Sequence, residues 1–171
     1  MYKKLEINPH ELFYHGTDAV FDRFEDQFKG SHTGWDNTIH GFFFTDKKEN
    51  ALLFGDTIIE ARLTVSNPMD FRLTAIFNDR SQASLIWEIL SGEKLSGIKA
   101  LYTINRVIGL GDFMDMHKAL NSENCKKLLV EAGHDGIISS LGNGEVEYIV
   151  FKPSQIEIIE MNRSVSPGLS R

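Results

Sequence analysis

Glu147 is chemically conspicuous because a carboxylate occupies an apolar position of an alternating strand. The stretch from Glu145 to Phe151 places Glu147 on the same face as Ile149 and Phe151. Burying an unpaired carboxylate is costly, so this side chain opens onto a cleft, has a polar partner, or lies in water at the strand edge. An edge glutamate in water is the commoner case. The cleft alternative makes Glu147 a candidate catalytic residue.

A second chemically suggestive segment ends an early apolar strand. Residues 11–17 finish in His15, Gly16 and Thr17. A glycine lets a ligand approach the backbone, while the imidazole and the hydroxyl supply side-chain hydrogen bonds. The segment therefore suits the floor of a cleft. A strand that runs into a turn and carries a structural histidine has the same pattern and is more common.

Aromatic residues flank a predicted strand-to-helix connection. Residues 41–45 form a predicted strand, and Asp46 and Glu49 have the spacing of a capping box for a helix that runs to about Phe54. Phe43 and Phe54 would then face each other across a gap about one planar ring thick. Such a gap suits a flat heterocycle, although plain core residues would show the same pattern.

Composition restricts the class of protein. The chain has 171 residues, 42% of them hydrophobic and 25% charged, which predicts one domain over residues 1–161 and a disordered tail over 162–171. The net charge of −6 argues against broad electrostatic capture of nucleic acid. The single cysteine, Cys125, excludes an internal disulfide and fits a reducing compartment. No apolar run reaches membrane-spanning length, and no signal peptide is expected.

The remaining pattern predicts an α+β fold, with strands early and late in the chain and helices in the middle. Strands are also expected over residues 57–65, 135–140, 145–151 and 156–161, and helices around Phe21 to Phe28, over 81–90 and 112–120, and from the N-cap Ser122 to 132. His32 and His40 lack a ligand-spaced carboxylate or cysteine, so no metal site is expected. The sequence contains no phosphate-binding loop, dinucleotide fingerprint or nucleophile elbow.

Three segments, in this order, resemble the signature segments of ADP-ribosyltransferases. They are Tyr14 to Thr17, Gly41 to Thr45 with the following helix to Phe54, and Glu147 to Phe151. The pattern is closest to the histidine–tyrosine–glutamate branch, which includes diphtheria toxin and the poly-ADP-ribose polymerases. The whole chain is similar to the small ADP-ribosyltransferase domains in polyvalent proteins of phages and mobile elements. This resemblance implies a split antiparallel β-sheet core with flanking helices and a helical middle insertion.

The resemblance also implies roles for individual residues. His15 would bond a ribose hydroxyl of NAD, and the Gly16 backbone would hold the nicotinamide carboxamide. Phe43 and Phe54 would sandwich the nicotinamide ring. Glu147 would accept a hydrogen bond from the nicotinamide-ribose 2′-hydroxyl and stabilise positive charge as the glycosidic bond breaks.

Further positions extend or depart from the family pattern. Thr17 and Phe44 complete the implied set of NAD-contacting residues. Glu145 and Glu147 resemble the paired glutamates of arginine-modifying members, so Glu145 would orient an acceptor, with a solvated turn residue as the alternative. Phe43 replaces the usual stacking tyrosine, and Ala51 stands where a carboxamide-binding serine is often found.

The implied activity is enzymatic transfer of one ADP-ribose unit from NAD, as co-substrate, to a macromolecular acceptor, with release of nicotinamide and no metal. A protein acceptor is favoured over nucleic acid because the chain is acidic. A catalytically silent module that binds NAD, ADP-ribose or a protein partner is one alternative, and an NAD glycohydrolase is another. No membrane partner is expected. The protein would act in its own cytoplasm or, like an effector or toxin, in a host cytoplasm.

Overall fold

The computed structural model describes residues 2–18, 24 and 39–163. The predicted helix around Phe21 to Phe28, apart from Phe24, lies outside the described residues. So do His32 and the remaining residues from 29 to 38, and so do the residues from 164 onward. Residues 162 and 163, which were expected to belong to the disordered tail, instead end the last strand.

Within the described residues, seven strands form one sheet in the order β4-β5-β6-β2-β1-β3-β7. They are β1 (Phe13–Thr17), β2 (Phe42–Thr45), β3 (Thr57–Leu63), β4 (Pro68–Asp70), β5 (Gly136–Gly142), β6 (Glu145–Val150) and β7 (Ile156–Arg163). Neighbouring strands are antiparallel apart from β4 and β5, which are parallel. The predicted strands are confirmed with small shifts at their ends. Strand β4 was not predicted; it is three residues long and begins at Pro68, at the edge of the sheet, where a proline is tolerated.

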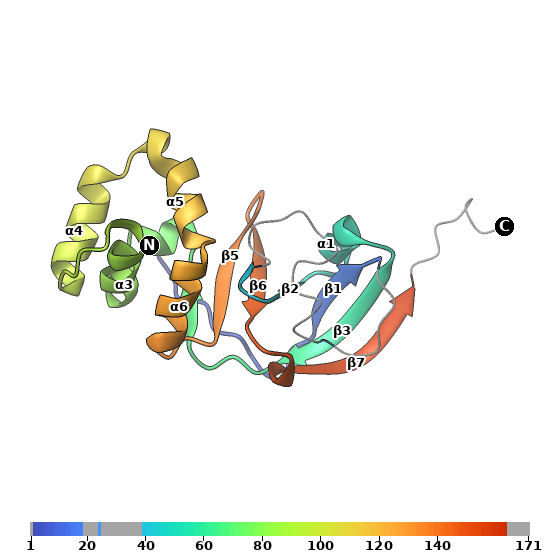
Figure 1. Cartoon of the computed structure of the whole chain (residues 1–171). Helices are drawn as coiled ribbons and strands as arrows, with labels where there is room; N and C mark the ends of the chain where they lie inside the picture. The colour runs from blue at the N-terminus through green and yellow to red at the C-terminus, as the bar shows by residue number, and fades with distance from the viewer. Residues whose placement is uncertain (1, 19–23, 25–38, 164–171) are drawn as a thin grey trace.

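The sheet is divided at the junction of β1 and β2. These strands share one register pair, Tyr14 with Thr45, whereas β3 pairs with β7 along its whole length. Figure 1 shows β5 and β6 running in a different direction from β1, β3 and β7. The α+β class and the split sheet implied by the resemblance are therefore confirmed. His15 lies on β1 at this junction.

The helices lie mainly between β4 and β5 in the chain. They are α1 (Lys48–Ala51), α2 (Leu73–Ile76), α3 (Arg80–Ser91), α4 (Gly97–Val107), α5 (Phe113–Leu120) and α6 (Glu123–Glu131), with short 3-10 helices η3 (Leu52–Phe54), η4 (Leu110–Asp112) and η5 (Pro153–Gln155). The predictions of α3, of α5 and of the Ser122 cap of α6 are confirmed. Helices α2 and α4 were missed. Helix α4 mixes strong helix formers with a glycine and several β-branched residues, and burial of Ala100 and Ile104 in the apolar cluster covered by the helices stabilises it.

The connection after β2 differs from the prediction. Lys47, not Asp46, is the N-cap of α1, and no side chain caps this helix. The Thr45 hydroxyl instead donates to the Lys47 carbonyl at 2.7 Å. The expected continuous helix is also wrong, because α1 ends at Ala51 and the tighter 3-10 turn of η3 leads to Phe54. Phe54 therefore does not point where a regular helix would have placed it.

Two apolar clusters cover the two faces of the sheet. One cluster joins Phe43, Ile137 and Ile149 to the buried side chains of the helical half. The other contains Phe13, Phe44 and Tyr148. Figure 1 shows α3 to α6 gathered on one side of β5. Alternation along β6 therefore turns Glu147 toward the face that carries Phe43 and Ile149.

Cys125 belongs to the helix-covered cluster. It is fully buried on α6, and burial raises the pKa of its thiol to about 12. A thiol with so high a pKa is not a nucleophile at neutral pH. Cys125 is therefore a packing residue of the helix-covered cluster.

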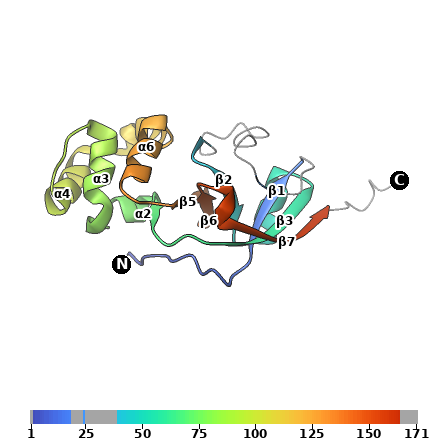
Figure 2. The same cartoon turned by 60° about the horizontal axis from the view of Figure 1, so that its bottom comes forward.

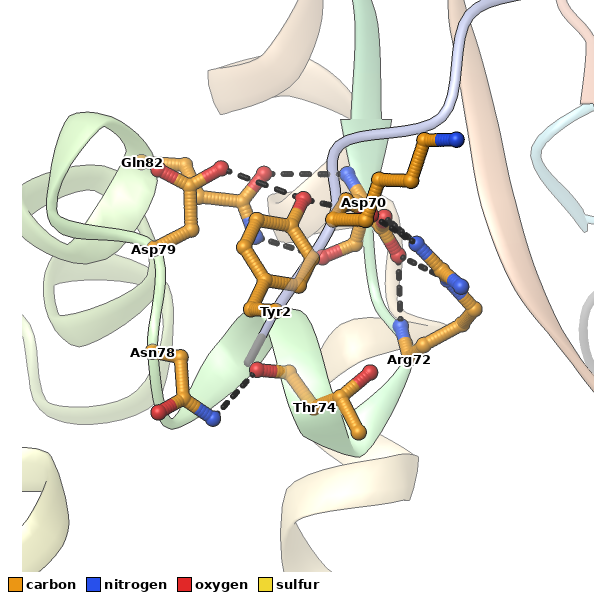
Figure 3. Close-up of polar contacts among 8 residues, drawn as sticks. Tyr2, Asp70, Arg72, Thr74, Asn78, Asp79 and Gln82 are labelled. Carbon is orange, nitrogen blue, oxygen red and sulfur yellow. Dashed lines mark hydrogen bonds and ion pairs between the residues drawn. The ribbon is translucent and has the colours of Figure 1, made fainter.

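The N-terminal segment links β1 to the helical half. Figure 2 shows it running along the molecule from β1 to α2. The Tyr2 hydroxyl lies 3.2 Å from Asp70 Oδ2 and 3.3 Å from Asp79 Oδ2, and Figure 3 shows its ring between these two carboxylates. Arg72 bonds Asp70 at 2.6 Å and also donates to the Lys3 carbonyl. Gln82 bonds the backbone of Asp70, so this network fixes β4 against α3.

Arg72→Met should destabilise the fold by roughly 2 kcal/mol, because it leaves the carboxylate of Asp70 buried without its cation. The Asp70 side chain is 6% exposed and that of Arg72 is 21% exposed. Urea denaturation at pH 7 measures the effect. Arg62→Met is the matched control, because Arg62 pairs with Glu157 on the surface at 3.5 Å. Equal losses in the two variants would contradict a structural role for the Asp70 network.

Candidate active site

Glu147 lies on β6 between two neighbouring strands. Thr45 on β2 and Ser139 on β5 are its cross-strand partners. Only 3% of the residue is exposed, and the Ser139 hydroxyl donates to Oε1 at 3.5 Å. The alternative of a solvated edge glutamate is therefore wrong. The strand is internal, and the carboxyl group is buried with a polar neighbour.

Burial raises the pKa of Glu147 to about 7, because loss of water disfavours the charged form. The hydrogen bond from Ser139 acts in the opposite direction and offsets part of this effect. The group is therefore half ionised near neutral pH. A carboxylate held in a dry site stabilises a neighbouring positive charge far better than one in water.

Ser139 was not among the residues predicted from the sequence, although a signal for it was present. Ser139 and Glu147 lie four residues before and four residues after Asn143. Asn143 and its two glycine neighbours have positive φ angles, as a tight hairpin turn requires. A turn centred on Asn143 pairs residues at equal distances from it. Register counting would therefore have identified Ser139 as the neighbour of the glutamate.

His15 is buried at the junction of the two halves of the sheet. Its Nδ1 lies 2.6 Å from the Phe43 carbonyl oxygen, and its ring contacts Phe24, Phe43 and Phe44 with centroids 5.1, 4.8 and 5.5 Å away. Burial lowers the pKa of His15 to about 4, so the ring is neutral at neutral pH. A carbonyl oxygen only accepts, so the proton resides on Nδ1. Nε2 then carries the lone pair and has the chemistry to accept a hydrogen bond from a hydroxyl.

Gly16 and Thr17 are buried with His15 at the end of β1. A Cβ atom at Gly16 would overlap the carbonyl oxygen of Ala51 in α1. The glycine is therefore required for packing of α1 against β1, in addition to any role toward a ligand. Ala51 itself is fully buried, so a serine hydroxyl at this position would need a buried partner.

Phe43 and Phe54 contact each other directly. Their centroids are 4.8 Å apart and their planes lie at 61°, an edge-to-face arrangement. A flat ring between two stacked faces would need them about 7 Å apart, twice the contact distance of stacked carbons. The predicted open gap is therefore wrong for this conformation. The reason is that η3 folds Phe54 onto the apolar face of Phe43.

Two further predicted residues, Phe44 and Glu145, have different surroundings. Phe44 is fully buried in the cluster on the opposite face of the sheet, where it contacts the ring of His15. Glu145 shares the strand of Glu147 but lies at the surface, 2.8 Å from Lys47 Nζ. The hydrogen bond and charge of Lys47 lower the pKa of Glu145. The structure therefore brings His15, Phe43 and Phe54 into contact, with Gly16 next to His15 on β1, whereas Glu147 lies on β6, on the sheet face that carries Phe43.

Metal-binding clusters and membrane-spanning helices are both absent from the described residues. No group of three or more His, Cys, Asp or Glu residues that could hold a metal ion occurs in this part of the chain. Nor does any helix of residues 2–18, 24 and 39–163 combine the length and apolarity needed to cross a bilayer.

Comparisons with known proteins place the chain in a family. The family described as "ADP-Ribosyltransferase in polyvalent proteins" matches residues 10–166. A crystal structure of an anti-CRISPR protein has a TM-score of 0.49 and 14% sequence identity, covering 88% of this chain and 98% of that one. No curated protein matches. The family match spans the three signature segments that hold His15, Phe43 and Glu147, so the chain belongs to the ADP-ribosyltransferases of polyvalent proteins.

Proposed function

We propose that this domain transfers one ADP-ribose unit from NAD to a protein acceptor and releases nicotinamide. ADP-ribosyltransferases use NAD as their co-substrate. The observation that carries the proposal is the burial of Glu147 on an internal strand, close to the junction that holds His15. A buried carboxylate on the face of Phe43 and Phe54 is costly for stability and needs a functional reason.

The chemistry of the proposed reaction suits this carboxylate. The C1′–N bond between ribose and nicotinamide breaks, and nicotinamide leaves as a neutral molecule with the electron pair of that bond. Positive charge then develops on the ribose, where ionised Glu147 stabilises it. A nucleophilic atom of the acceptor bonds to C1′ and loses its proton to solvent. The reaction needs neither a protein nucleophile nor a metal.

The other residues have matching chemistry for the donor. Nε2 of neutral His15 would accept a hydrogen bond from a ribose hydroxyl, and the Gly16 backbone would bond the carboxamide. Phe54 would move off Phe43 to admit the nicotinamide ring between them. Phe54 is only partly buried and lies on a short 3-10 turn before Gly55, so this movement is local.

Phe54→Ala should weaken NAD binding about tenfold, because one stacking face for nicotinamide is lost. Leu53→Ala is the matched control, since Leu53 lies on the same turn and is 73% exposed. Calorimetric titration with NAD measures both dissociation constants. Equal affinity of the two variants would show that nicotinamide does not bind against Phe54.

Nicotinamide release from NAD tests the proposed function. The purified domain is incubated with NAD labelled in its ADP-ribose part, with and without proteins of a cell lysate. A transferase releases nicotinamide and labels a protein. Release without labelling would identify a glycohydrolase, and NAD binding without release would identify a silent module.

A further inference from the structure

A cavity of about 270 Å³ lies on the face of the sheet toward which Glu147 points, and Ser139, not Glu147 itself, lines it. Its wall includes Ile137 and Ser139 of β5, Ile149 of β6 and Met116 of α5. Ser139 is also the cross-strand partner and hydrogen-bond donor of Glu147. Ser139 therefore lines the cavity and also contacts the buried carboxylate of Glu147.

The cavity lies mainly on the β5 side of β6, although Ile149 of β6 and His40, two residues before β2, also line it, and the Phe43–Phe54 ring pair lies on the β2 side. Strand β6 is paired with β5 on one side and with β2 on the other. Ile149 has Ile137, a cavity residue, as its partner on β5, and Phe43 as its partner on β2. Neither Phe43 nor Phe54 lines the cavity. Glu147, two residues before Ile149, stands between the two regions.

This arrangement matches the directions of approach and departure in the proposed reaction. In a single displacement at a sugar carbon, the incoming group attacks the face opposite the leaving group. With nicotinamide held against Phe43 and Phe54, on the β2 side of Glu147, an acceptor must approach from the β5 side. The cavity lies on that side.

The cavity wall contains no Asp, Glu, Lys or Arg among the described residues. Its polar members are His40, His117, Asn121, Ser139 and Ser140, and the other described lining residues are apolar. A guanidinium or phosphate group would lose its hydration there without gaining a charged partner. Such a wall suits an uncharged group that forms hydrogen bonds. Glu145, which was expected to orient an arginine, pairs with Lys47 and does not line the cavity.

The size of the cavity also limits what it can hold. Its volume of about 270 Å³ lies just below the roughly 300 Å³ at which small-molecule pockets begin. It therefore accommodates one side chain or one base, not a dinucleotide. A base would bring phosphates toward a chain with a net charge of −6, which favours a protein side chain.

We propose that this cavity is the acceptor subsite and that it receives an uncharged, hydrogen-bonding side chain of a protein. This inference rests on the proposed transferase function. The oxygen or nitrogen of that side chain bonds to C1′ of the ribose and loses its proton to solvent. Nicotinamide leaves with the electron pair of the broken bond.

Small molecules that mimic different acceptors test which chemical class of group binds in the cavity. The probes are the N-acetyl amides of serine, tyrosine and asparagine, the cation agmatine, and deoxynucleosides, each mixed with the domain and NAD. Nicotinamide release and the mass of the ADP-ribosylated product are measured. The proposal predicts that one or more of the neutral amides raises release and becomes modified. Modification of agmatine or a nucleoside in preference to the amides would overturn it, as would release that no amide stimulates.

Met116→Trp tests the location of the subsite, because it fills the cavity from α5. Met116 is 6% exposed and lines the cavity, whereas Met114, two residues away, is 86% exposed and does not. We expect Met116→Trp to lower amide-stimulated release about tenfold relative to release in buffer alone. Met114→Trp, the matched control, should leave both rates unchanged.

A second substitution keeps the test decisive if Met116→Trp fails to fold. Leu73→Trp blocks the cavity from a side chain that is 45% exposed, and thermal denaturation checks the fold of each variant. If a folded variant with a filled cavity keeps the wild-type ratio of amide-stimulated to basal nicotinamide release, the acceptor does not bind in this cavity. If the wild-type domain releases no nicotinamide under any condition, the transferase function itself fails and the subsite falls with it.

Discussion

Glu147→Gln should lower nicotinamide release at pH 8 by at least about a hundredfold, the scale on which a preorganised electrostatic group acts in a transition state. The substitution removes a negative charge but almost no volume. Because Glu147 is buried, water does not replace the lost charge. The ground state of NAD has little extra charge on the ribose, so we expect NAD affinity to change much less than turnover.

Steady-state release and calorimetric NAD binding together measure this effect. Glu157→Gln is the matched control, because Glu157 is also a strand glutamate but its side chain is 70% exposed on β7. The control should retain full activity. Unchanged release in Glu147→Gln would remove Glu147 from the reaction. If NAD affinity falls as much as turnover does, Glu147 acts by binding NAD in the ground state and not by stabilising the transition state.

The same substitution should stabilise the fold by about 3 kcal/mol at pH 8.5 and by almost nothing at pH 4. The pKa of Glu147 is about 7 in the folded state and 4.5 in the solvated, unfolded chain, a difference worth roughly 3 kcal/mol. The folded state therefore binds this proton more tightly than the unfolded state does. Stability from the protonated carboxyl is fully present below pH 4.5 and is lost as the pH rises through 7.

Urea denaturation of both proteins across this pH range measures the difference. His15, whose pKa is about 4, titrates in both proteins, so its contribution largely cancels in the comparison. A difference that stays constant between pH 4 and pH 8.5 would contradict burial of the ionised carboxylate. An increase toward alkaline pH together with lost turnover would show that Glu147 is retained for function at a cost in stability.

Hydrophobic periodicity and turn residues are sufficient to predict most of the sheet. Strands β3, β5 and β6 alternate clearly, and the Gly142-Asn143-Gly144 turn fixes the pairing of β5 with β6. The helical middle is less predictable. Helix α4 mixes strong helix formers with a glycine and several β-branched residues, and its contacts with α3, which the local sequence does not specify, add to its stability.

The candidate site, like the fold, can be predicted from the sequence only in part. Residue types and strand alternation alone identify the chemical groups that are present, namely the glutamate on an apolar face, the His15-Gly16 strand end and the two phenylalanines. These features are local properties of the chain, so they can be recognised without knowing which segments pack together.

The burial of Glu147, by contrast, is a consequence of tertiary packing, because its exposure depends on β2, β5 and the covering elements. The same holds for the contact of Phe54 with Phe43, which follows from the 3-10 turn of η3 and not from a regular helix. The neutral tautomer of His15 depends on a carbonyl 28 residues away in the chain. Desolvation and hydrogen bonding between distant segments set the charge of both groups, so their pKa values could not be inferred from sequence neighbours.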